Sequence, residues 1–159
     1  MKLSNPLPNA KMSIWPLGDI YNPFGAMKEW YYQQFGMNGH NGLDIGYSAG
    51  WGSPVYATHK GFARKVWNEN NATKSYGYGV WITNYEEGIE TVYWHLSQTH
   101  IKEGETVESG TLIGQLGNTG SIKSRWGTGL MTDEERSQPG FPGSHLHFGM
   151  RMCSRDTDG

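Results

Sequence analysis

Residues 78–96 read YGVWITNYEEGIETVYWHL, and this stretch decides the class of fold that we expect. It holds two runs rich in β-branched and aromatic residues, Tyr78–Tyr85 and Glu90–Leu96, on either side of a polar segment that contains Gly88. Two such runs joined by a short turn with glycine are typical of a β-hairpin. The prediction therefore starts from two adjacent antiparallel strands.

Further short strands are expected on both sides of this hairpin, separated by turns that contain glycine. The candidates are Pro54–Thr58, Gly61–Asn68, Thr111–Gly117 and His145–Met152. Residues 1–39 are irregular instead, apart from an aromatic segment, Met27–Phe35, for which one or two helical turns are expected. Repeated short strands with turn signals predict an all-β fold.

The composition bounds the class of protein. With 159 residues the chain has the length of one domain with a hydrophobic core. Its formal net charge of −2 and isoelectric point near 6.3 argue against a nucleic-acid-binding protein, which normally carries a basic face. Only 18% of residues are charged, while 23 are glycine, seven tryptophan and nine tyrosine. This balance favours turn-rich β-structure with aromatic residues in the core or along a surface.

Cysteine and the chain ends give further limits. Cys153 is the only cysteine, which excludes an internal disulfide and a zinc site built from several cysteines, and we expect it to serve packing. No stretch is apolar enough to span a membrane. The first residues, MKLSNPLPNAKM, contain no apolar run and are not expected to form a signal peptide. The ending SRDTDG suggests that a longer parent chain continues past it.

The stretch GSHLHFGMR, residues 143–151, places two histidines one residue apart in an expected strand. Successive strand side chains alternate between the two faces, so His145 and His147 point one way, and Leu146 and Phe148 the other. A buried imidazole pair is costly unless each ring finds a partner. An isolated pair of this kind also fits a solvated strand face, so its meaning depends on the rest of the chain.

The stretch HNGLDIG, residues 40–46, supplies a histidine and an aspartate four residues apart. Gly42 and Gly46 disfavour a helix here, and a tight strand would still direct His40 and Asp44 inward. An imidazole nitrogen and a carboxylate oxygen are both good ligands for first-row metals. Alone the pair is a weak signal, because Asp44 also fits a turn and His40 an exposed position.

One histidine of the second motif, His145 or His147, would complete a His-Asp-His set. Three protein ligands leave the fourth tetrahedral position for water, as in a catalytic zinc site rather than a structural one. The remaining imidazole would then lie beside that water, and His95, in VYWHLS, would approach from a neighbouring strand. On its own, however, a histidine flanked by large aromatic side chains is by default a hydrogen-bonded core residue.

The segment 121–144, SIKSRWGTGLMTDEERSQPGFPGS, shows no strand alternation and is dense in glycine, proline and polar residues. Loops of this length within a compact domain are usually functional or disordered. Because the segment leads directly into His145, we interpret it as a functional loop.

The motifs also occur in a recognisable order. They are HNGLDI (40–45), GSPVYATHKG (52–61), YGYGVWITN (76–84), TVYWHLS (91–97), GETVESGTLIGQLGNTG (104–120) and HLHFG (145–149). In order, spacing and glycine turns, the chain from Gly39 to Arg151 resembles the LytM/lysostaphin-type family of zinc metallopeptidases, which cut the peptides of bacterial peptidoglycan. The resemblance implies a compact antiparallel β-domain whose groove is floored by the sheet and walled by loops.

Position by position, the resemblance implies one Zn²⁺ ion held by His40, Asp44 and His147. It also implies that His145 and His95 are catalytic residues beside the metal. We expect His145 to act as the general base and His95 to stabilise the oxyanion, a division that stays open to exchange. The expected activity is that of a zinc metalloendopeptidase that hydrolyses cross-links or stem peptides.

Two histidines and one insertion fall outside the family pattern. His59 and His100 match no family site, and we expect both at the surface. The family commonly runs from NTG through a few residues to HLHF, whereas roughly twenty extra residues intervene here. This loop is expected to form one wall of the groove and so to influence substrate preference.

The expected organisation is an N-terminal segment, residues 1–38, packed on a metallopeptidase domain, residues 39–152, followed by a tail, residues 153–159. We expect a monomer whose partner is a peptidoglycan peptide, with no nucleic acid and no membrane span. Such an enzyme would act at the cell wall or in the periplasm, as a bacterial or phage-borne protein. The bond stays open, because the family cuts both glycine cross-bridges and the link from D-Ala to diaminopimelate.

Two other functions compete with this one. The stretch 104–117 also resembles the hairpin of biotinyl and lipoyl carrier domains, which would make the chain a non-catalytic binding or scaffold module of the cell envelope. A carrier needs a lysine at the hairpin tip between hydrophobic residues, and none stands there. A zinc endopeptidase that acts on proteins outside the cell wall is also compatible with the sequence.

Overall fold

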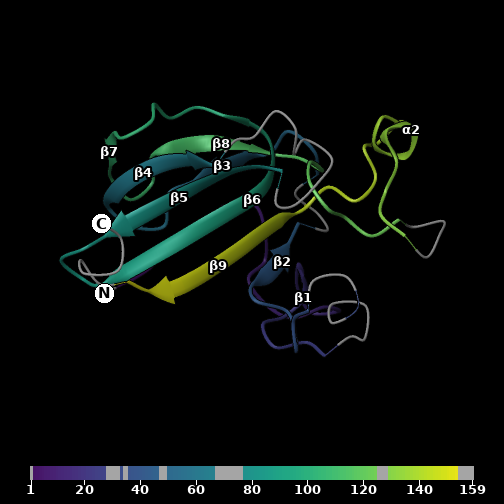
Figure 1. Cartoon of the computed structure of the whole chain (residues 1–159), viewed down its shortest axis with the longest axis horizontal. Coiled ribbons are helices and arrows are strands. Elements are labelled where there is room, and N and C mark those ends of the chain that lie inside the picture. Colours follow the sequence, from purple (N-terminus) through teal and green to yellow (C-terminus); the bar gives the residue numbers. More distant parts are fainter. Residues whose placement is uncertain are drawn as a thin grey trace.

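The computed structural model describes residues 2–27, 33, 36–46, 50–66, 77–124 and 129–153. In this part of the chain the strands form one nine-stranded antiparallel sheet, ordered β1-β2-β9-β6-β5-β4-β7, in which β8 also pairs with β6 and β3 with β8 (Figure 1). The strands are β1 Ile20–Asn22, β2 Leu43–Ile45, β3 Pro54–Tyr56, β4 Gly61–Val66, β5 Tyr78–Asn84, β6 Ile89–Thr99, β7 Thr106–Val107, β8 Leu112–Leu116 and β9 Leu146–Met152. The predicted all-β fold is confirmed, and among the described residues no helix has the length and hydropathy of a membrane span.

The expected hairpin forms from β5 and β6, with Trp81 opposite Val92. Its turn contains Gly88 at φ 65°, a left-handed conformation that glycine adopts without steric cost. Strand β6 continues to Thr99, beyond the predicted end at Leu96. The reason is pairing, because β6 contacts β5 and β9 along its first part and β8 along its last.

Alternation divides the central strands into a buried face and a more open one. Val80, Ile82 and Tyr93 are fully buried and belong to the hydrophobic core. Trp81 and Trp94, on the opposite face, are half-buried. One face of the sheet therefore packs against the core, and the other is available for a site.

The N-terminal segment contributes to the same core. Leu7, Ala10 and Ile20 are buried in the main hydrophobic cluster, and the backbone N–H of Tyr56 donates to the carbonyl of Pro6 at 2.9 Å. The division of the chain at residues 38 and 152 stays a prediction.

Some local structure lies where none is predicted from the sequence. Strands β1, β2 and β7 have two or three residues each, too few for an alternating pattern to show. The helix α2, Asp133–Arg136, lies within the segment for which only a loop is predicted, and a capping box of Thr132 and Glu135 stabilises it. The helical turns expected for Met27–Phe35 lie, apart from Met27 and Gln33, outside the described residues.

The prediction that His59 lies at the surface is wrong. This residue is 4% exposed; its Nδ1 lies 2.8 Å from the carbonyl of Lys60 and its Nε2 lies 2.9 Å from the hydroxyl of Thr91. Both ring nitrogens are thus satisfied, which is what allows an imidazole to be buried. His100 is exposed, as predicted.

Candidate metal centre

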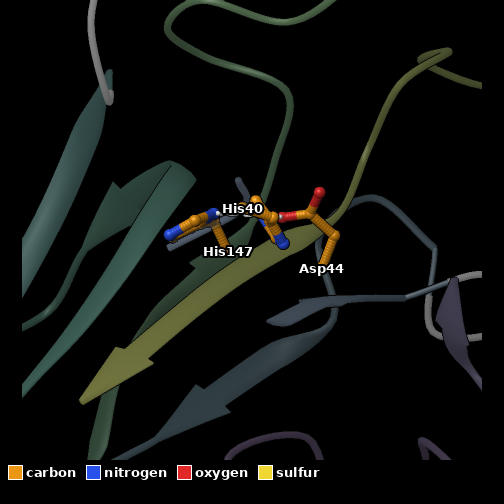
Figure 2. Close-up of side chains that lie close together, drawn as sticks. All are labelled: His40, Asp44 and His147. Atoms are coloured by element: carbon orange, nitrogen blue, oxygen red, sulfur yellow. Dashed lines mark hydrogen bonds and ion pairs between the residues drawn. The ribbon is translucent and has the colours of Figure 1, made fainter. Parts of the chain in front are cut away.

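Three buried side chains meet where β2 lies beside β9 (Figure 2). The Nε2 atom of His40 and the Nδ1 atom of His147 lie 3.1 and 3.0 Å from Oδ1 of Asp44. The two imidazole nitrogens lie 3.1 Å from each other. The three atoms therefore form a nearly equilateral triangle, and no member of the set is more than 7% exposed.

The register of the sheet brings these residues together. Asp44 stands opposite His147 in the β2–β9 pair, and His40 comes from the segment just before β2. Gly46 follows β2 at φ 141°, a conformation that other residues rarely adopt. Gly42 leaves room for the ligand, because an added Cβ would lie 2.6 Å from Nε2 of His147. The short strand β2 between two glycines thus holds Asp44 opposite His147, and the segment before it supplies His40.

The donor set fits a zinc ion. Ligand atoms about 2.0–2.1 Å from a tetrahedral zinc lie roughly 3.3 Å from one another, close to the 3.0–3.1 Å sides of the triangle. Three electron-pair donors in mutual contact repel each other unless a proton or a cation lies between them. Two imidazoles with one carboxylate are also a ligand set that zinc prefers.

Groups behind the ligands orient them, as is usual in metal sites. Nδ1 of His40 lies 3.3 Å from the carbonyl of Pro23. A carbonyl can only accept, so this nitrogen carries the ring proton and Nε2 presents its lone pair to the site. The Nδ2 group of Asn22 donates to Oδ2 of Asp44 at 2.8 Å, which leaves Oδ1 for the metal.

The electrostatics favour the forms that bind metals. Burial alone would raise the pKa of the Asp44 carboxyl, but His145 and hydrogen bonds with His147 and His40 outweigh it and hold the pKa well below its usual value. Burial lowers the pKa of His147, and the nearby Asp44 only partly offsets this. Near neutral pH the site thus holds a carboxylate and a neutral imidazole, the forms that coordinate a cation.

Two further imidazoles face the triangle. Nε2 of His145 lies 3.7 Å from Oδ1 of Asp44, and its Nδ1 lies 2.7 Å from the carbonyl of Gly143. The ring of His95 lies 4.6 Å from that of His145, centre to centre, and its Nδ1 lies 2.7 Å from the carbonyl of Thr119. Since a carbonyl can only accept, both Nδ1 atoms carry a proton, and the Nε2 atom of each ring is left for the site.

The backbone at His95 is strained. Its φ of 65° is left-handed, which is uncommon for residues other than glycine. Burial lowers the pKa of His95 well below its ordinary value, and the neighbouring His145 and His147 lower it further. The ring is therefore neutral near pH 7. Such strain is typical of positions where a side chain must be directed to a site.

The structure brings together all the site residues predicted from the sequence. These are His40, Asp44, His95, His145 and His147. Their assignment to metal binding and to catalysis is taken up below as a proposal.

Three supporting residues have no counterpart among the sequence-based expectations. Trp94 stacks on His147 with ring centres 4.7 Å apart and planes 13° apart, and Tyr21 meets His145 edge-on at 5.7 Å. The third is Asn22, already described. Trp94 stands opposite His147 in the register of β6 and β9, a pairing that the sequence does not reveal. Tyr21 and Asn22 belong to a three-residue strand without a readable pattern.

The described part of the segment 121–144 is anchored to the site. The guanidinium of Arg136, which is 8% exposed, donates to the backbone carbonyls of Asn118, Gly120 and Met131. Further along, Phe141 has a φ of 45° and stacks on Trp51, with ring centres 4.3 Å apart and planes 20° apart. The described residues of the expected loop are thus held by specific contacts, and they lead directly into His145.

Residues 38–158 match the model of Peptidase family M23. The chain belongs to this family. The resemblance found in the motifs is thereby confirmed.

Individual proteins agree with this placement. An uncharacterized metalloprotease of Haemophilus influenzae is 37% identical over 82 residues, which is 51% of this chain and 16% of that protein. The crystal structure of a zinc-containing peptidase from Vibrio cholerae matches 84% of this chain and 33% of its own, with 25% identity and a TM-score of 0.57. The catalytic domain of the antimicrobial peptidase lysostaphin from Staphylococcus simulans matches 93% of this chain and 84% of its own, with 22% identity and a TM-score of 0.59. The chain thus spans a small part of the Haemophilus protein but most of the lysostaphin catalytic domain.

Proposed function

We propose that this chain is a zinc-dependent endopeptidase that hydrolyses cross-links or stem peptides of bacterial peptidoglycan. The observation that carries the proposal is the triangle of His40, Asp44 and His147 with the imidazoles of His95 and His145 beside it. The peptidoglycan substrate is supported by the motifs shared with LytM/lysostaphin-type enzymes. The protein would act as a monomer at the cell wall or in the periplasm, where that polymer lies.

The ligands would give the metal centre a charge that suits hydrolysis. With one carboxylate and two neutral imidazoles as ligands, a zinc ion would keep a net charge of about +1 and would supply Lewis-acid activation of the scissile carbonyl and of a water molecule, whose pKa it would lower to roughly 7. His40, Asp44 and His147 would hold the ion. His95 and His145 would bind and release protons.

We assign the general base to Nε2 of His145. The Nδ1–H group of this ring is donated to the carbonyl of Gly143 at 2.7 Å, which fixes the ring and its tautomer. Its lone pair then lies on the side of the ligand Asp44, at 3.7 Å from Oδ1. From there the ring accepts the proton of the attacking water and returns it to the leaving amine.

We assign stabilisation of the oxyanion to His95. Because its Nδ1–H is donated to Thr119, Nε2 must take up a proton from the solvent before it can donate to the substrate. Burial disfavours that proton in the free protein, as the lowered pKa of His95 indicates. Negative charge developing on the substrate oxygen favours it. The hydrogen bond is therefore strongest in the transition state, which is the condition for catalysis.

The test is release of dye from labelled cell walls by the zinc-loaded chain, with and without a chelator. We expect release that the chelator abolishes and added zinc restores. Zinc binding without release would favour a peptidase for other proteins. A chain that neither binds zinc nor releases dye would be a non-catalytic module.

Variants separate the metal ligands from the catalytic pair. His145→Ala and His95→Ala should each lose most of the release while metal analysis still finds one zinc per chain. His40→Ala should lose the metal itself. His100→Ala, an exposed histidine outside the site, is the matched control and should change neither quantity. Loss of zinc from the His145 or His95 variant would contradict the assigned roles.

A further inference from the structure

The face of the sheet that carries the metal centre continues beyond it. Asp44, His147 and Trp94 stand in one row across β2, β9 and β6. Because side chains alternate along a strand, positions two and four residues further on share the same face. Four residues from His147 and Trp94 stand Arg151 and Glu90, which are opposite each other in register.

Strands β5 and β4 extend this row of side chains. Val92 lies between Trp94 and Glu90 on the same face of β6. Trp81 of β5 stands opposite Val92, and Arg64 of β4 stands opposite Trp81. Two arginines, a tryptophan and a glutamate thus gather on the face of the metal centre (Figure 1 shows β9, β6, β5 and β4 side by side).

Glu90 is fully buried, and both of its carboxylate oxygens are bonded. Oε1 accepts from Nε of Arg151 at 2.7 Å. Oε2 accepts from Nη2 of Arg64 at 3.1 Å and from the hydroxyl of Thr83 at 2.8 Å. Two guanidinium groups therefore surround one carboxylate, and the cluster has one positive charge in excess.

The arginines, and not Glu90, face the solvent. The side chain of Arg64 is 34% exposed and that of Arg151 is 55% exposed. Both guanidinium carbons lie over the ring of Trp81, at 5.4 and 5.1 Å from its centre, so cation–π contacts hold them in place. The Nη1 groups of the two arginines have no hydrogen-bond partner within the described part of the chain.

We propose that Arg64, Trp81 and Arg151 form a subsite for a free carboxylate of the peptide substrate. The proposal rests on the proposed function and narrows its substrate to acidic peptides rather than neutral ones such as glycine bridges. Guanidinium groups recognise carboxylates through paired, charge-assisted hydrogen bonds. The chain as a whole carries a net charge of −2, so this cluster differs in sign from the molecule.

The spacing places the subsite within reach of a bound peptide. At about 3.3 Å per residue, Arg151 lies on the order of 13 Å along β9 from the metal ligand His147. An extended peptide covers that distance with three or four residues. The carboxylate that is recognised therefore belongs to a residue three or four positions from the scissile amide.

The experiment compares two cross-linked peptides of identical sequence, one with free side-chain and α-carboxylates and one with those groups amidated. The zinc-loaded chain should cleave the free acid with kcat/KM about tenfold higher, mostly through KM, because charge-assisted hydrogen bonds are lost in the amide. Added salt should reduce the preference, since the arginines are partly exposed.

Three variants test the residues themselves. Arg64→Gln and Arg151→Gln should each remove most of the preference, by raising KM for the free-acid peptide toward KM for the amidated one. Glu90→Gln should increase the preference, because it raises the excess charge of the cluster from one to two. Lys60→Gln, a change at an exposed lysine that pairs with Glu108 at 3.4 Å, is the control and should leave the preference as it is.

The outcomes separate this proposal from the proposed function. A wild-type chain that cleaves both peptides equally overturns the subsite and leaves the endopeptidase standing. A chain that cleaves neither peptide and releases no dye from labelled walls overturns the endopeptidase. Arginine variants that lose activity equally on both peptides, with a lower melting temperature, would assign the cluster to stability alone.

Discussion

Nδ1 of His147 lies 3.0 Å from Oδ1 of Asp44, although 103 positions separate the two residues in the chain. The pairing of β2 with β9 fixes this distance, because the two residues stand opposite each other in register. Ligands held by backbone pairing are already placed before a metal arrives, which favours affinity. Changes that disturb the space behind these ligands should therefore weaken metal binding without unfolding the sheet.

Gly42→Ala tests that statement. The added Cβ would lie 2.6 Å from Nε2 of His147 and 2.7 Å from the carbonyl oxygen of Phe148, and contacts this short force a neighbour to move. We expect the imidazole to shift and zinc affinity to fall about 10- to 100-fold, the usual effect of changes behind the ligands. Competition with a chromophoric chelator measures the affinity.

The matched control is Gly129→Ala, at a glycine with nothing within 4 Å of the added Cβ. It should keep the affinity of the wild-type chain. Equal affinities for Gly42→Ala and the wild type would show that the ring of His147 has room to move. That result would contradict the statement that the ligands are fixed in position before the metal binds.

Asp44→Asn tests the charge of the centre. The side chains have nearly the same shape, but the amide cannot supply the negative oxygen that His40 and His147 contact. We expect the variant to retain no zinc after dialysis. Zinc at 100 times its dissociation constant should stabilise the wild-type chain by about 2.7 kcal/mol and the variant by nothing. Thermal unfolding with and without zinc gives the comparison, and full stabilisation of the variant would argue against Asp44 as a ligand.

The metal-free chain should lose stability as the pH falls below 6.5. Burial lowers the pKa of His95 and of His147 in the folded state, so below 6.5 the unfolded chain binds more protons than the folded one. As the pH falls from 6.5 to the pKa that a ring has in the folded chain, each of the two histidines lowers the free energy of unfolding by about 1.4 kcal/mol per pH unit. Asp44 does not act in this window, because its pKa is lowered below 3.8 and its contribution is lost only in stronger acid.

Melting curves of the chelated protein between pH 8 and pH 5 measure this dependence. His95→Asn should make it shallower, because one of the two groups is removed. His100→Ala, at an exposed position, should leave it unchanged. A melting temperature that stays constant or rises toward pH 5 would show that the two rings are protonated as easily in the folded chain as in the unfolded one.

The metal ligands can be predicted from the sequence more readily than the residues that surround them. The ligands are readable because His40, Asp44 and the pair at 145 and 147 combine residue types that bind zinc with glycine turns in a known order. Strand alternation correctly places His145 and His147 on one face, as their contacts with Asp44 show. Strand alternation also makes the long strands predictable, since seven or more residues are enough for alternating apolar and polar side chains to show.

Features that depend on tertiary contacts are not readable in this way. His59 is buried because Thr91, from β6, supplies its partner, and nothing near it in the chain indicates this. His95 directly follows Trp94 yet both contact the site, because the left-handed backbone at His95 breaks the alternation. The helix α2 had a signal, the capping box from Thr132 to Glu135, that a four-residue helix makes easy to miss.

The stack of Phe141 on Trp51 should support catalysis through His145. Phe141 lies two residues before Gly143, whose carbonyl holds the Nδ1–H group of His145. An aromatic pair contributes about 0.5–1.5 kcal/mol beyond the area that it buries, enough to hold this exposed segment in one conformation.

We expect Trp51→Ala to lower kcat roughly tenfold or more, because a catalytic group that is misplaced by a fraction of an ångström loses most of its effect. The zinc content should stay at the wild-type level, since among the described residues neither Trp51 nor Phe141 contacts a metal ligand.

Phe141→Gly should behave in the same way, because glycine keeps the backbone at φ 45° without strain and removes only the ring. Trp15→Ala, at a tryptophan that is 58% exposed and outside the site, is the control. If both stack variants kept the full kcat, the segment before His145 would be held by other contacts, such as the hydrogen bond from Asn118 to the carbonyl of Pro142.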